Sequence, residues 1–333
     1  MKNVSFCPRP FEEIEISITG EVYTCCPNWN NFYSIGNIHK DTLENIWNSK
    51  NAIDVRKRIL NNDYSICDIN RCLYLKQNDF KTAYETNYKA VMNEYPKTVK
   101  FVYDKECNID CKICRDKITR LTENEIEVLN SKIDTFFLPI LKSAKILIIN
   151  AAGDPFGSRH SRLLIKQAAQ TYPDLKFDIH TNGILCNEEN LKKLNVTPDR
   201  ISIIRISIHA ATPQTYGKIV TNGEFYFPKI ISNLKYLSTL KSKYEFPIFI
   251  QFVILPDNYK EIPSFIELAE QLNVLPTFWE YRRENCAYEN KEHLFIYQKE
   301  HPLYTDLVKV LQHPKVKQYK RFFSPLFFDL IES

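Results

Sequence analysis

The chain has 333 residues, of which 44% are hydrophobic and 25% charged, and its formal net charge is +4. This is ordinary globular composition, and the length suffices for one domain of about 200 residues and a smaller one. The small net charge argues against a nucleic acid or a membrane surface as partner. Ten cysteines without an export signal predict a cytoplasmic protein whose thiols serve metal or redox chemistry.

The N-terminal segment is rich in cysteine. A β-hairpin is expected over residues 11–17 and 21–24 with Gly20 at the bend, and an amphipathic helix is expected to start at Thr42 and to run through 53–59. Four thiols brought together by such a hairpin and a loop suit either zinc or an iron–sulfur cluster, and spacing alone does not choose between them. The cysteines before residue 75 are Cys7, Cys25, Cys26, Cys67 and Cys72.

A helix and linker are expected over residues 78–96, and a larger α/β domain follows. There, short β-branched runs alternate with helical patterns, which predicts parallel strands wrapped by helices. Six such units are too few for a closed eight-stranded barrel, and functional residues should gather at the C-terminal ends of the strands. Strands are expected near 99–105, 145–150, 175–180, 202–208, 247–254 and 275–280, and helices near 123–139, 160–171, 187–194, 226–240, 260–272 and 303–312.

Directly after the first of these strands, Cys107, Cys111 and Cys114 form a CxxxCxxC motif. Three thiolates in one loop can hold three irons of a 4Fe–4S cube and leave the fourth iron open for chemistry. A zinc site would need a fourth Cys or His nearby, and none occurs between Arg115 and Gly153. The spacing therefore favours an iron–sulfur cluster over zinc or disulfides.

The motif resembles the signature of the radical S-adenosylmethionine (SAM) superfamily. This resemblance implies a partial (β/α)6 barrel in which the amino and carboxylate groups of SAM chelate the open iron. Reduction of the cluster would then cleave SAM to a 5′-deoxyadenosyl radical that removes a hydrogen atom from the substrate. Ile113 stands where the family usually has an aromatic residue, and the resemblance implies that it contacts the adenine.

Further motifs resemble the SAM-binding turns of this family. A Gly-Asp-Pro turn at a strand end exposes a carboxylate that suits the ammonium of SAM, although an ordinary turn is the alternative. On the fourth strand, Arg205, Ser207 and His209 share one face, and His209 is either a structural residue or a substrate contact. The resemblance implies that SAM is bound by Ile113, Ala152, Gly153, Asp154, Pro155, Thr181, Asn182, Ser207 and Val253.

The N-terminal segment resembles the SPASM or twitch module, a small α+β cysteine domain that holds an auxiliary 4Fe–4S cluster. The implied ligands are Cys7, Cys25, Cys67 and Cys72, with Cys25 preferred to Cys26 because of the Gly-x4-Cys spacing. The expected domains are therefore 1–95 for this module with its linker helix, 96–285 for the partial barrel and 286–333 for a helical extension.

The resemblance implies that the auxiliary cluster assists oxidation of a sugar or another small polar metabolite, by dehydrogenation or epimerisation. An external one-electron donor such as flavodoxin or ferredoxin would supply electrons. Cys286 is a candidate hydrogen donor, and a buried thiol is the alternative reading.

Three alternatives stay open. The chain could be a peptide maturase that makes cross-links or epimerised residues; the lack of a recognition segment before Cys7 favours the small molecule. It could also be an iron–sulfur electron-transfer or binding protein without SAM chemistry, or a zinc-stabilised interaction protein.

Overall fold

The structure is a computed structural model that describes residues 6–27, 33–68, 72, 88–114, 117–149, 152–282 and 292–332. The chain divides into two compact units, of which the first comprises residues 1–105, 121–152 and 160–177, and the second comprises 106–120, 153–159 and 178–333. The domain boundaries expected from the sequence stay predictions. Cys286 and most of the linker expected over 78–96 lie outside the described residues.

In the first unit, the predicted hairpin is confirmed, with Gly20 at a φ of +79° in the bend. Its first strand also pairs in parallel with the strand that precedes the CxxxCxxC motif, placing Ile14 beside Val99 and Ile16 beside Phe101. The strands of this unit are ordered β3-β2-β1-β4-β5, namely β1 (Glu13–Ile16), β2 (Glu21–Tyr23), β3 (Gly36–Asn37), β4 (Thr98–Phe101) and β5 (Ile146–Ile149).

The helices of this unit depart from prediction in three places. The helix expected to run from Thr42 through 53–59 is two helices, because Ser49 caps the start of the second by accepting a hydrogen bond from the Ala52 N–H. Residues 9–12 form a helical turn where the hairpin was expected to start, because Pro10 suits a first turn and the Phe11 N–H bonds to the Pro8 carbonyl. The helix expected over 123–139 is interrupted by a π-helical turn, since the N–H groups of Phe136 and Phe137 both bond to the Lys132 carbonyl. The helices are α1 (Arg9–Glu12), α2 (Leu43–Trp47), α3 (Lys50–Leu60), α5 (Glu123–Asn130), α6 (Leu138–Ile140) and α7 (Arg159–Thr171), whose first residue belongs to the second unit.

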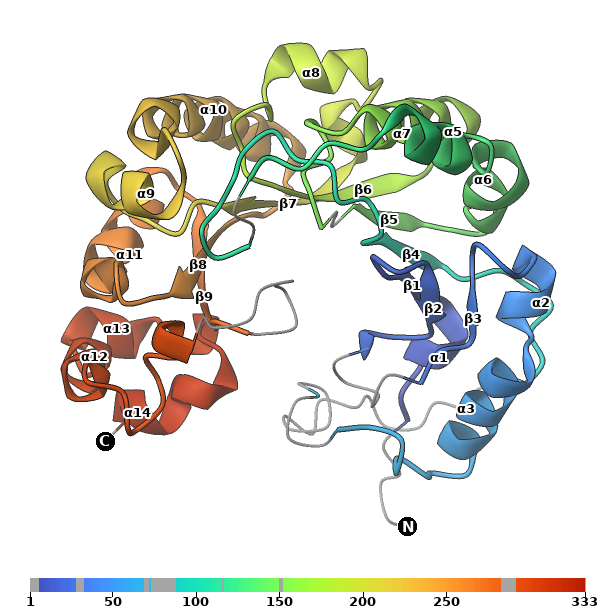
Figure 1. Ribbon diagram of the computed structural model, residues 1–333, viewed down its shortest axis with the longest axis horizontal. Coiled ribbons are helices and arrows are strands. Elements are labelled where there is room, and N and C mark those ends of the chain that lie inside the picture. Colours follow the sequence, from blue (N-terminus) through green and yellow to red (C-terminus); the bar gives the residue numbers. More distant parts are fainter. Residues whose placement is uncertain are drawn as a thin grey trace. The chain divides into compact units, whose positions relative to one another are not determined.

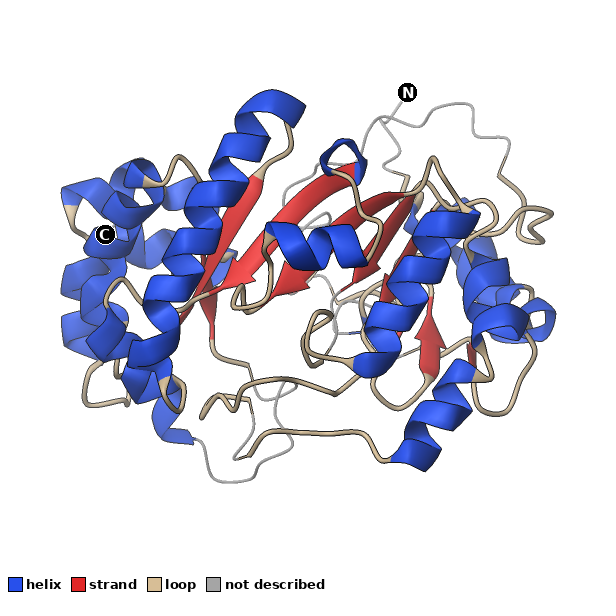
Figure 2. Ribbon diagram, turned by 90° about the horizontal axis from the view of Figure 1, so that it is seen from above, coloured by secondary structure: helices blue, strands red, loops and turns tan. Residues whose placement is uncertain are grey.

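In the second unit, the strands lie side by side and helices pack along one face (Figure 1, Figure 2). β7 pairs in parallel with β8, and β8 with β9. The strands are ordered β6-β7-β8-β9, namely β6 (Lys176–Thr181), which begins in the first unit, β7 (Ile201–Ser207), β8 (Ile248–Ile254) and β9 (Leu275–Glu280). The helices are α8 (Glu188–Lys193), α9 (Pro213–Ile219), α10 (Gly223–Tyr244), α11 (Ile262–Gln271), α12 (Tyr304–Leu311), α13 (Pro314–Gln318) and α14 (Phe328–Glu332).

Burial alternates along these strands. In β8 every second residue is buried and the others are half-buried, and Ile204 and Ile206 of β7 follow the same pattern. Helices α9, α10 and α11 lie on the outer side of β7 to β9 (Figure 1). The apolar half of each strand therefore belongs to the core, while the other half lines a more accessible sheet face.

All six predicted strands between 99 and 280 are confirmed to within a few residues. Helix α9 was not predicted; Thr212 caps it by accepting a hydrogen bond from the Thr215 N–H, and Pro213 occupies its first position. Among the described residues, no helix has the length and apolar character needed to cross a membrane.

Candidate cluster and cofactor site

The loop that carries the CxxxCxxC motif is a tight, hydrogen-bonded turn in the second unit. The Cys107 N–H donates to the Thr119 carbonyl at 3.1 Å, and the Cys114 N–H donates to the Cys111 carbonyl at 2.8 Å. Cys107 is buried, whereas Cys111 and Cys114 are half-buried. The three thiols thus combine a fixed backbone with partial access, as an open iron that takes a ligand requires.

Helix α9 fixes the middle of this loop. The Lys112 N–H donates to the Ile219 carbonyl at 2.9 Å, and Cys111 forms a β-bridge with Val220. The end of a helix missed by the sequence analysis therefore positions the cysteine motif.

The Asp154 side chain stabilises the turn after β5. Its carboxylate accepts four hydrogen bonds: Oδ2 from the Thr181 hydroxyl (2.7 Å) and the Asn182 N–H (2.8 Å), and Oδ1 from the Phe156 (3.0 Å) and Gly157 (3.1 Å) N–H groups. Burial raises the pKa of this carboxyl, and these four donors oppose the rise. The carboxylate thus binds the chain itself, and its predicted contact with the ammonium of SAM stays a prediction.

Asn182 links this turn to the cysteine loop. Its Nδ2 donates to Asn108 Oδ1 at 2.9 Å and lies 4.0 Å from Cys107 Sγ. Gly157 approaches the same loop closely, because a Cβ there would lie 3.0 Å from the Asn108 nitrogen and 2.8 Å from its Oδ1. Asn182, a predicted cofactor contact, is therefore next to the first cluster cysteine.

Glu106 is a second buried anchor that the sequence analysis missed. Its side chain is fully buried and accepts from the Arg159 N–H at 2.8 Å and from Arg159 Nε at 3.4 Å, while its carbonyl accepts from the Asp154 N–H at 2.9 Å. A charged residue immediately before Cys107 was the available signal, since buried charges need partners.

Other predicted cofactor contacts occupy the half-exposed sheet face or its surroundings. Ser207 donates to Gln251 Oε1 at 3.1 Å, and the side chain of Ile113 is half-buried. The Val253 backbone is already used, because its N–H donates to His209 Nδ1 (3.1 Å) and its carbonyl accepts from Asn258 Nδ2 (2.8 Å). Only the half-buried Val253 side chain is available for an adenine.

His209 bridges two strand ends. Its N–H donates to the Gln251 carbonyl at 3.0 Å, its carbonyl accepts from Asn258 Nδ2 at 2.8 Å, and it has a positive φ of +54°. Burial lowers its pKa to about 4, so the imidazole is neutral at pH 7 and its Nδ1 accepts a hydrogen bond. These contacts describe a structural histidine.

A charged cluster lies on the same sheet face. Arg205 donates from Nε and Nη2 to the two oxygens of Asp178, each at 3.3 Å, and His180 Nε2 lies 3.3 Å from Asp178 Oδ1. Arg205 is half-buried, and its guanidinium lies 5.1 Å from the centroid of the Phe249 ring. This arrangement gives the face a fixed guanidinium that could bind an anionic or hydroxyl-bearing group.

The N-terminal thiols influence one another in the first unit. Burial raises the pKa of Cys7 to about 11 and that of Cys67 to about 12, and it raises the pKa of Cys25 well above its usual value. The charge of Cys7 raises the pKa of both Cys25 and Cys67, and the charge of Cys72 raises the pKa of Cys7. These mutual influences indicate that the four thiols lie near one another, as the ligands of a single iron–sulfur cluster must.

Within the described ranges, no three His, Cys, Asp or Glu side chains are arranged to hold a single metal ion. The assignment of both cysteine sets to iron–sulfur clusters therefore depends on the chemistry of their thiol donors.

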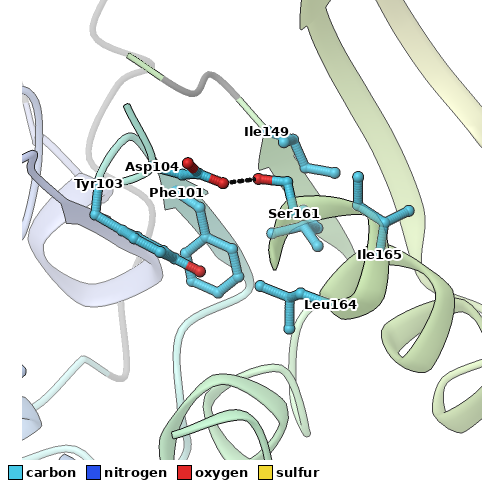
Figure 3. A pocket seen from close by; sticks show the side chains of 8 residues that line it. Phe101, Tyr103, Asp104, Ile149, Ser161, Leu164 and Ile165 are labelled. Carbon is cyan, nitrogen blue, oxygen red and sulfur yellow. Dashed lines mark hydrogen bonds between the residues drawn. The ribbon is translucent and has the colours of Figure 1, made fainter. Parts of the chain in front are cut away.

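A small cavity in the first unit contains a buried polar pair (Figure 3). The Ser161 hydroxyl donates to Asp104 Oδ2, and the side chains around the pair are mostly apolar. Tyr103, which lines this cavity, also hydrogen-bonds His160 at 2.7 Å. None of the cavity-lining residues belongs to either set of cysteines, so this cavity is not the predicted cofactor site.

The family model of the SPASM iron–sulfur cluster-binding domain matches residues 7–73. A curated relative, the uncharacterized protein MJ0804 of Methanocaldococcus jannaschii, is 26% identical over 170 residues, which is 50% of each chain. The chain thus spans about half the length of that relative.

Among solved structures, the chain is similar to Streptococcus suis SuiB bound to S-adenosylmethionine, with 14% identity and a TM-score of 0.45, covering 84% of this chain and 56% of that one. It is also similar to TYW1 with a lysine-pyruvate adduct bound, with 17% identity and a TM-score of 0.41, covering 73% of this chain and 82% of that one.

The SPASM match defines an iron–sulfur protein and confirms the predicted N-terminal module. This match covers the N-terminal cysteine set, and the CxxxCxxC loop after β4 lies outside it.

Proposed function

We propose that this protein is a radical SAM enzyme, which cleaves SAM reductively and removes a hydrogen atom from a carbon of a small polar substrate, with the SPASM cluster assisting the oxidation. The observation that carries the proposal is the 107–114 loop, whose three thiols sit on a backbone fixed to α9. The cluster and SAM would supply one-electron chemistry that no side chain offers.

The chain's own residues would hold and orient these groups. Cys107, Cys111 and Cys114 would bind three irons, and Asp154 would fix the turn that aims Asn182 at the same loop. Ser207 would contact the ribose. The half-buried side chains of Ile113 and Val253 would contact the adenine, and the turn at residues 152–155 would approach the amino group of SAM.

The substrate would bind at the half-exposed face of β6 to β9. Arg205, Asp178 and the Ser207–Gln251 pair present charge and hydrogen-bonding groups there. Such a face supports a sugar or another polar metabolite more than an apolar one. A peptide is the second candidate substrate; one similar structure, of Streptococcus suis SuiB with 14% identity and a TM-score of 0.44, is bound to the precursor peptide SuiA.

Anaerobic reconstitution with iron and sulfide tests the chemistry. We expect about eight irons per chain, as two 4Fe–4S cubes, and 5′-deoxyadenosine after addition of SAM and dithionite. Flavodoxin or ferredoxin should replace dithionite. The triple variant C107A/C111A/C114A should lose about four irons and all cleavage, whereas C186A, which removes a buried thiol outside both sets, should behave as wild type. Cleavage that persists in the triple variant would contradict the proposal.

The substrate class is tested by hydrogen transfer. Deuterated sugars and deuterated peptides are supplied separately, and deuterium should appear in 5′-deoxyadenosine only with the true class. An R205A variant should show less deuterium transfer from the substrate, while its SAM cleavage without substrate stays unchanged. Deuterium transfer from peptides alone would show that the substrate is a peptide and not a small metabolite.

A further inference from the structure

Tyr216 carries a polar group that the proposed mechanism does not use. Its side chain is completely buried, and within the described part of the chain its hydroxyl has no hydrogen-bond partner. Leaving a buried hydroxyl unpaired costs about 1–3 kcal/mol. A group that is missing from the protein chain itself would explain why this position has a tyrosine and not a phenylalanine.

The fold fixes this tyrosine close to the cysteine loop. Tyr216 lies on α9, and the end of α9 binds the loop through the Lys112–Ile219 hydrogen bond and the Cys111–Val220 bridge. The Tyr216 carbonyl accepts from the Val220 N–H at 2.9 Å. The ring therefore sits one helical turn before the residue that pairs with Cys111.

The charges that influence Tyr216 also indicate that it lies near the cysteine loop. After burial, the largest influences that raise the Tyr216 pKa are the charges of Cys111 and Cys107, followed by that of Asp154. A tyrosine hydroxyl, whose ordinary pKa is about 10, carries its proton at neutral pH, so it can act as a hydrogen-bond donor. The acceptors that would satisfy it are thiolate or sulfide atoms.

We propose that the Tyr216 hydroxyl donates a hydrogen bond to a sulfur atom of the cluster held by Cys107, Cys111 and Cys114. This inference rests on the proposed function, because it needs that cluster. Hydrogen bonds to the sulfurs are one of the factors that set the potential of an iron–sulfur cluster. Reduction adds negative charge, so the bond strengthens and favours the reduced form that SAM cleavage requires.

The test is Tyr216→Phe, which removes only the hydroxyl. In reconstituted protein, a redox titration followed by electron paramagnetic resonance should show a more negative midpoint potential for the SAM-binding cluster. The equilibrium constant for reduction should fall about tenfold, which corresponds to about 59 mV for a one-electron couple. Tyr226→Phe, a half-buried tyrosine on α10, is the matched control and should leave the potential unchanged.

A second readout does not depend on catalysis. After exchange into D2O, the reduced cluster of the wild type should show a coupled deuteron by electron–nuclear double resonance, and Tyr216→Phe should lose it. Wild-type protein with ring-deuterated tyrosine should also show ring deuterons near the cluster. This measurement needs no variant, so it remains valid if Tyr216→Phe folds poorly.

Unchanged potential and unchanged deuteron coupling in Tyr216→Phe would overturn this inference alone, because the cluster would still be present. Failure of the wild type to assemble the Cys107–Cys114 cluster would overturn both the inference and the proposed function.

Discussion

Replacing Asp154 by Asn tests whether this carboxylate organises the site. The side chain accepts four hydrogen bonds, and three of the donors are backbone N–H groups that cannot reverse direction. An Asn side chain offers one acceptor oxygen in place of two. In its better orientation the oxygen faces Phe156 and Gly157, the Thr181 hydroxyl rotates to accept from the new NH2 group, and the Asn182 N–H loses its acceptor.

The magnitude follows from this count. One buried N–H left unpaired costs about 1–3 kcal/mol, and the remaining bonds lose their charge assistance, so we expect D154N to lower the free energy of unfolding by about 3 kcal/mol. At roughly 2–4 °C per kcal/mol, the melting temperature should fall by about 6–12 °C.

Thermal unfolding by circular dichroism measures this loss. D257N, at an exposed aspartate, is the control and should stay within about 0.5 kcal/mol of wild type. The spectral response of the cluster to SAM is also measured in D154N, below the melting temperature of the variant. This response distinguishes a carboxylate that only positions the turn from one that contacts SAM directly. A stability change in D154N as small as that of D257N would refute the reasoning.

Three further predictions follow from individual contacts. The neutral, buried His209 has a folded pKa of about 4 against an unfolded value of 6.5, so its contribution to stability is complete above pH 6.5 and is lost as pH falls toward 4. Wild type should therefore lose about 3 kcal/mol more than His209→Asn over that range, measured by urea unfolding, and parallel pH profiles would contradict this. Gly157→Ala should push Asn108 and the cysteine loop aside, so that the reconstituted protein binds about four fewer irons, one cube; full iron content would show that the loop adapts. Cys25→Ser should remove the SPASM cluster while Cys26→Ser retains it, because the charges of Cys7 and Cys67 both raise the pKa of the Cys25 thiol. The reverse pattern in the iron assay would make Cys26 the ligand in place of Cys25.

The sequence predicted much of the framework because its signals are local. The spacing of Cys107, Cys111 and Cys114 indicated the cluster, and Gly20 between two short apolar runs indicated the hairpin. The alternation of apolar and polar residues along β7 indicated which of its faces would be buried. Each of these patterns spans fewer than fifteen residues, within which backbone geometry fixes side-chain direction.

What only the tertiary structure decided are the partners of polar groups far apart in sequence. The sequence indicated a carboxylate at a strand end, and only the structure shows that the Asp154 carboxylate binds Thr181 and Asn182 across 27 and 28 residues. No sequence pattern links Tyr216 to the cysteine loop; helix α9, which carries Tyr216, binds that loop through its end. A residue's type states what it can donate or accept, but the chain's long-range packing selects the acceptor, because burial makes every unpaired polar atom costly.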